Sequence, residues 1–146
     1  MKLAEIKKLQ RLAKAKTDGE KSRYGAVKKR QDDFLAAADA HAEASARPFE
    51  PEGEASGADL MLHGRYLEQL TRAEKLCRKA AHALEPEKAA RRRALQRTLG
   101  EENAWEKIGD RVATARRAKA QDFEESRRSE FILNARSGEK SGAGGD

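Results

Sequence analysis

The chain has 146 residues, of which 38% are charged and 5% are aromatic, and its formal net charge is +6. Ordinary globular domains are only about a quarter charged, so this composition excludes a fold with a broad three-dimensional core. No stretch is apolar enough for a signal peptide or a membrane span, and the single cysteine, Cys77, excludes an intrachain disulfide. We therefore expect a cytosolic protein.

Residues 1–45 have the pattern of a first coiled-coil helix. Apolar and small residues recur at alternating spacings of three and four, which is the a/d seam of a coiled coil and argues against disorder. The predicted seam is Leu3, Ile6, Gln10, Ala13, Thr17, Glu20, Tyr24, Val27, Gln31, Phe34, Ala38 and His41. Its middle, from Thr17 to Glu20, offers nothing apolar and includes Gly19, so we expect local fraying there.

Residues 46–57 are predicted to be a loop, because two prolines and two glycines fall within about a dozen residues. Ser56 is the expected N-cap of the following helix. Asp59 lies in its first turn, where the helix dipole favours an anion.

Residues 58–136 read as one long second helix of about 115 Å, at about 1.5 Å per residue. Pro86 is its only proline, and we expect it to kink the helix near Ala83 or Leu84, with a complete break as the alternative. The glycine-rich residues 137–146 are expected to be a disordered tail. The apolar stripe of the second helix is Leu60, Leu67, Leu70, Cys77, Ala81, Leu84, Leu95, Trp105, Ile108, Val112, Ala115 and Phe123.

These elements predict an all-α fold, a long antiparallel two-helix coiled-coil hairpin with unequal arms. A first arm that folds back covers the second only to roughly Gly100. The remainder, including Trp105 and Phe123, then has no partner within the chain. Because isolated helices owe most of their stability to packing, this part needs a second protein or a homodimer.

No arrangement of residues points to catalysis. His41, His63 and His82 are far apart, and neither an HExxH nor a CxxC motif is present. We therefore expect no catalytic residue, no metal site, no cofactor and no small-molecule ligand. Acidic and basic residues are interleaved along both helices, which makes nucleic-acid binding unlikely.

A basic run extends from Lys88 to Arg97. Its arginines can bind phosphates or an acidic protein surface, or they can form a solvated helix face. Trp105, the only tryptophan, is either a packing residue or a binding hot spot.

Three segments are similar to a known family: Tyr66-Leu-Glu-Gln-Leu70, Gly100-Glu-Glu-Asn-Ala-Trp105-Glu-Lys-Ile-Gly-Asp-Arg111, and Glu124-Glu-Ser-Arg-Arg-Ser-Glu-Phe131. On these the chain resembles the flagellar FliJ family and its injectisome counterparts of the YscO type. Family members often carry Asp-Glu and small residues where this chain has Ser129-Glu130-Phe131. The resemblance implies a cytoplasmic component of the bacterial type III protein export apparatus, peripheral to the inner membrane. Such a protein acts as the central stalk of the hexameric export ATPase and links it to the export-gate membrane protein and to export chaperones, without inserting into the membrane itself.

The resemblance also implies two partner surfaces. The expected gate-protein surface is Gln31, Leu35, Ala38, Tyr66, Leu70, Ala73 and Cys77. The expected ATPase surface is Arg91, Arg92, Arg93, Arg97, Trp105 and Arg116. The alternative function is a free-standing coiled-coil scaffold or a basic, nucleic-acid-associated coiled coil.

Overall fold

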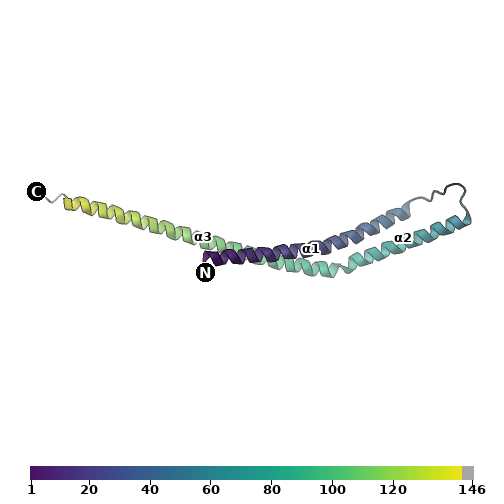
Figure 1. The fold of residues 1–146 in the computed structure, drawn as a ribbon, viewed down its shortest axis with the longest axis horizontal. Coiled ribbons are helices and arrows are strands. Elements are labelled where there is room, and N and C mark those ends of the chain that lie inside the picture. The colour runs from purple at the N-terminus through teal and green to yellow at the C-terminus, as the bar shows by residue number, and fades with distance from the viewer. Residues whose placement is uncertain (143–146) are drawn as a thin grey trace. The chain divides into compact units, whose positions relative to one another are not determined.

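The computed structural model describes residues 1–142, and this part of the chain is all helical, without strands (Figure 1). Its helices are α1 (Leu3–Ala46), α2 (Gly57–Ala83) and α3 (Glu85–Gly142). The chain divides into two units. One contains Met1–Lys14 and Gly100–Asp146, and the other contains Ala15–Leu99. The prediction of an all-α protein is confirmed.

One face of α1 is buried, and it is the face predicted from the heptad spacing. Ile6, Ala13, Thr17, Val27, Gln31 and Ala38 are buried. The other six predicted seam positions are half-buried, and no buried residue of α1 lies outside the seam. The three-and-four spacing therefore identified the packing face of this helix.

The expected fraying at the middle of α1 is wrong. The helix is continuous from Thr17 to Glu20, and Thr17 is fully buried. A Cβ atom added at Gly19 would meet nothing within 4 Å, so this glycine faces open space. Its helix-propensity cost of about 1 kcal/mol is too small to open a helix that is packed on both sides of it.

The start of α2 has the predicted cap. The hydroxyl of Ser56 accepts a hydrogen bond from the backbone N–H of Asp59 at 3.2 Å, and the backbone N–H of Ser56 donates to the Asp59 carboxylate at 3.0 Å. This reciprocal capping box satisfies two N–H groups that a helix start would otherwise leave unpaired.

A single residue, Leu84, interrupts the second arm between α2 and α3. Its backbone is still near the helical region, with φ −83° and ψ −11°, and its N–H donates to the carbonyl of Ala81 at 3.2 Å. Pro86 is the second residue of α3 and therefore lies in its first turn. The N–H groups of a first turn have no carbonyl partner within the helix, so the missing N–H of proline costs α3 no hydrogen bond there. The arm is therefore bent at the place where the sequence predicted a kink.

The contact between α1 and α3 extends further along α3 than predicted. Within its unit, the side-chain amide of Gln10 donates to the carbonyl of Trp105 at 3.0 Å and lies against Gly109. Half-burial continues to Ala113, so the expected end of pairing near Gly100 is wrong. The first turn of α2 is exposed and does not pack on α1. Each residue of α1 therefore pairs with a residue of the second arm that lies closer to the C-terminus than predicted.

From residue 114 to residue 142 every residue of α3 is exposed, including Phe123. The helix was predicted to end at Arg136, with a disordered tail over 137–146, but it continues to Gly142, and 143–146 lie outside the described residues. Ser137 donates from its hydroxyl to the carbonyls of Leu133 and Asn134, both at 3.1 Å. Extending a formed helix adds one backbone hydrogen bond per residue without a new nucleation cost.

Candidate protein-interaction surfaces

Two of the residues expected to contact a gate protein are not accessible. Gln31 is 4% exposed and Ala38 is 0% exposed, because both lie on the buried face of α1. A partner can reach these side chains only if the helices separate. The structure therefore places them in the packing between helices.

Gln31 is the centre of a buried polar network at the bend. Its Nε2 donates to the carbonyl of Ala81 at 3.1 Å and to the carboxylate of Glu85 at 2.6 Å. Its Oε1 accepts a hydrogen bond from Nζ of Lys88 at 2.9 Å. A polar residue at a seam position is the one sequence signal for this network, and it does not identify which residues of the second arm Gln31 contacts.

The network adds a second hydrogen bond to a backbone carbonyl at the bend. The last carbonyls of a helix lack donors from within the helix, and α2 ends at Ala83. The carbonyl of Ala81 receives both the N–H of Leu84 and the amide of Gln31. Gln31 therefore joins α1 to Ala81 and Glu85, which lie on either side of Leu84.

The other expected gate residues are not gathered around one depression. Leu35 lies in a depression of about 250 Å³ with Arg78 and His82, whereas Tyr66 lies in a different depression near the loop. Leu35 and Tyr66 are exposed. The remaining three, Leu70, Ala73 and Cys77, are half-buried.

Arg78 forms a small ion-pair cluster beside this depression. Its guanidinium donates to Glu74 at 3.0 Å and to Asp39 of α1 at 3.2 Å. These hydrogen bonds, first the one to Glu74 and then the one to Asp39, raise the pKa of Arg78 above its ordinary value. The cluster is exposed to solvent, so it contributes more to the choice of register than to stability.

The basic run expected to contact the ATPase is largely solvated. Arg92, Arg93 and Arg97 are exposed and Arg91 is half-buried. No ion pair joins any of these four to another residue that the structure describes. Their charges are therefore free to meet a partner.

The other two expected ATPase residues differ from each other. Trp105 is half-buried, and its backbone carbonyl accepts a hydrogen bond from the side-chain amide of Gln10. The expectation that Trp105 has no partner within the chain is wrong. Arg116 is exposed and follows the last half-buried residue of α3.

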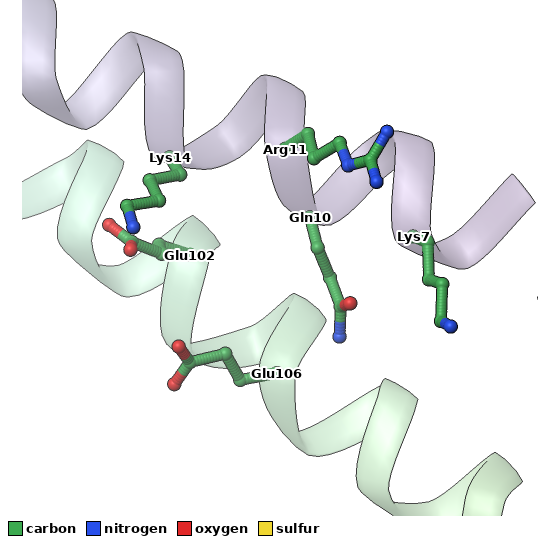
Figure 2. Close-up of a pocket in the computed structure, with 6 residues that line it drawn as sticks. All are labelled: Lys7, Gln10, Arg11, Lys14, Glu102 and Glu106. Carbon is green, nitrogen blue, oxygen red and sulfur yellow. The ribbon is translucent and has the colours of Figure 1, made fainter. Parts of the chain in front are cut away.

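A charged depression of about 360 Å³ lies between α1 and α3 within the unit that contains both ends of the described chain. Figure 2 shows Gln10 pointing from α1 toward α3, and Lys14 pointing toward Glu102. Lys7, Arg11 and Glu106 complete its lining. Opposite charges on the two helices favour this pairing, but the sequence reasoning did not identify Lys14 or Glu102.

A second depression, of about 480 Å³, lies where the loop meets α2. We call its lining the loop-end surface: Phe49, Pro51, Glu52, Asp59, Leu62, His63 and Tyr66. The ring of Phe49 lies 4.5 Å from that of His63, centroid to centroid. This contact holds the loop against α2.

In the described part of the chain, no three His, Cys, Asp or Glu side chains are grouped so that they could hold a metal ion. None of the helices described has an apolar stretch sufficient to cross a membrane. Comparisons with protein-family models, with curated proteins and with solved structures gave no match.

Proposed function

We propose that this protein is an antiparallel two-helix coiled-coil hairpin with unequal arms, and that it is a cytoplasmic, non-enzymatic component of a bacterial flagellar type III export apparatus. In this role it is the central stalk of the hexameric export ATPase and links the ATPase to the export-gate membrane protein and to export chaperones. It acts without a cofactor or a small-molecule ligand, at the cytoplasmic side of the inner membrane.

The long-range contacts within each unit support the antiparallel arrangement. In one unit, Asp39 contacts Arg78, and Gln31, which is earlier in α1, contacts Lys88, which is later in the second arm. Residues later in α1 therefore contact residues earlier in the second arm, which is the pattern of an antiparallel pair. In the other unit, a contact between Gln10 and Trp105 joins α1 to α3.

The observation that carries the stalk proposal is the exposed portion of α3, residues 114–142. It is helical throughout and has no buried residue, yet it presents Phe123, Phe131 and Leu133. A helix of this kind gains stability from packing against a partner. A single exposed helix also has the thickness, about 10–12 Å with side chains, that a ring channel can accommodate.

The basic run suits a stalk that shifts within its ring. Exposed ion pairs are each worth only about 0–1 kcal/mol and exchange readily, so a helix coated with arginine makes weak and replaceable contacts. The exposed Leu35 and Tyr66 are the residues of the expected gate surface that remain accessible to a partner.

The test replaces Arg91, Arg92, Arg93 and Arg97 together by Gln, in an assay of the purified export ATPase with this protein. We expect normal helicity and weaker stimulation of ATP hydrolysis, with the largest deficit at low salt, where electrostatic attraction is least screened. The matched control replaces four exposed basic residues of α2, Arg65, Arg72, Lys75 and Lys79, by Gln, and should leave the stimulation unchanged.

Two results would contradict this proposal. The first is unchanged stimulation by the arginine variant at every salt concentration. The second is the absence of any stimulation by the native chain, together with binding to random DNA that falls steeply with salt, which would favour the nucleic-acid-associated alternative.

A further inference from the structure

Large apolar side chains are concentrated around the loop-end surface. Leu60, Met61 and Leu62 are 56%, 64% and 64% exposed, and Tyr66 is 50% exposed. Of the large apolar side chains, Phe49, Leu62 and Tyr66 line a depression of about 480 Å³ at one end of α2, whereas Leu60 and Met61 are exposed outside its lining. Single exposed apolar residues are ordinary on protein surfaces, but three large ones that line the same depression mark a candidate interaction site.

The charge of the same segment is opposite to that of the whole chain. Residues 47–59 contain one basic residue, Arg47, and four acidic residues, in a chain with a net charge of +6. The acidic residues are Glu50, Glu52, Glu54 and Asp59, and all are exposed. The carboxylate of Asp59 is held ionised by its hydrogen bonds to Ser56, and Glu52 and Asp59 lie in the lining of the depression itself.

We propose that the loop-end surface binds a basic amphipathic helix of a partner protein, whose apolar face packs on Phe49, Leu62 and Tyr66 and whose Lys and Arg side chains face the loop carboxylates. Helices that lie in grooves commonly combine an apolar contact with a charged rim in this way. The acidic rim disfavours an anionic membrane and disfavours the same surface of a second copy, since like charges repel. Tyr66 is shared with the gate surface of the proposed function, but this inference does not depend on that function.

The first experiment measures binding of a defined probe to the full chain by fluorescence anisotropy. The probe is a fluorescein-labelled 18-residue peptide with Leu on one helix face and Lys on the other, and the comparison peptide has Glu in place of Lys. We expect the Lys peptide to bind at least about tenfold more tightly at low salt and to lose affinity as salt rises. Equal affinity for the two peptides would overturn the proposal.

The second experiment uses matched variants. Replacing Glu50, Glu52 and Glu54 together by Gln should weaken binding of the Lys peptide about tenfold, since the variant loses three exposed ion pairs that are each weak. Replacing Leu62 and Tyr66 by Ser should weaken it by a similar factor. The control replaces three exposed carboxylates of α3, at Glu124, Glu125 and Glu130, by Gln, and should leave the affinity unchanged.

The location is checked by NMR of the labelled full chain, in which peptide-induced shifts should fall within residues 47–66. Shifts confined to other residues, or equal weakening by the α3 control, would overturn the proposal. So would tighter binding to phosphatidylglycerol vesicles than to the peptide. Self-association that is abolished by the Leu62→Ser, Tyr66→Ser variant would assign the surface to a second copy of the chain and would also overturn it.

Discussion

Gln31 illustrates how one polar side chain specifies a helix pairing. It is buried, yet both its nitrogen and its oxygen have partners, contributed by Ala81, Glu85 and Lys88. A shift of one heptad in register would leave this amide buried without partners, which costs about 1–3 kcal/mol. An apolar residue at the same position would pack equally well in several registers.

Replacing Gln31 by Ala should lower the free energy of unfolding by about 1–3 kcal/mol, because the amide is lost and Lys88 loses its acceptor. Urea unfolding followed by circular dichroism measures the change. The matched control is Gln121→Ala on the exposed part of α3, which should change stability by less than about 0.5 kcal/mol. Equal effects of the two substitutions would show that the network does not stabilise the pairing.

Asp59 gives the N-terminus of α2 a defined pH dependence. The backbone N–H of Ser56, and then its hydroxyl, lower the pKa of the Asp59 carboxyl from its ordinary value of 3.8. A lowered folded-state pKa stabilises the capped helix above the unfolded value, and this stabilisation is lost as the pH falls through the folded value. The first turn of α2 should therefore loosen only below about pH 4.

The carboxyl carbon chemical shift of Asp59 measures this titration directly. Its midpoint should lie below 3.8 in the native chain and should rise part of the way toward 3.8 in Ser56→Ala, which keeps the backbone donor but loses the hydroxyl. A midpoint for Asp59 that is unaffected by Ser56→Ala would contradict the role given to the hydroxyl.

At the scale of single residues, the sequence predicted which residues face the packing surface better than it predicted which residues they contact. Heptad spacing placed Thr17 and Gln31 on the packing face although neither is apolar, because spacing constrains the whole helix at once. Local composition alone predicted fraying at Thr17, which burial prevents. The contacts of Gln31 depend on the register between α1 and the second arm, and no local sequence pattern determines that register.

At the scale of elements, the bend at Leu84 and the register depend on the loop. Pro86 predicted the position of the bend to within a residue, because the ring of a proline disrupts the helical turn that precedes it. The register was predicted less well, because residues 57–62 were assumed to pack on α1. They are exposed and the loop residue Phe49 packs on His63 instead, so the pairing is displaced toward Gly109.

The two parts of the second arm should differ in protection. Backbone amides of residues 114–142 should exchange with solvent faster than those of residues 67–81, because the former belong to a helix without buried side chains. Hydrogen exchange with mass spectrometry of the monomeric protein measures both. Residues 101–113 should exchange as slowly as the paired region, since α1 contacts Trp105 and Gly109. Equal protection over 67–81 and 114–142 in a monomer would contradict this assignment.

At the scale of the whole molecule, the sequence predicted the all-α class and the absence of a broad core, because both follow from composition and periodicity. It did not predict the loop-end surface, which arises from the packing of Phe49 on α2 and thus from tertiary contacts. The gate surface expected from the family resemblance combines buried and exposed residues, because a resemblance in sequence identifies positions but does not say whether they are buried.

The central claim is the antiparallel pairing of α1 with the second arm, and pulsed electron resonance between two spin labels tests it most directly. Labels at exposed positions Lys21 and Gln96 should lie about 20 Å apart, given helix axes about 8–10 Å apart and the reach of the labels. Labels at Lys21 and Arg72 should lie more than about 35 Å apart, because more than twenty helical residues at about 1.5 Å each separate their levels.

Both pairs are introduced into a Cys77→Ser background and diluted into an excess of unlabelled chain, so that only distances within one molecule are measured. The account predicts the short distance for Lys21 with Gln96 and the long distance for Lys21 with Arg72. A long distance for the first pair, or a short distance for the second, would contradict the antiparallel pairing.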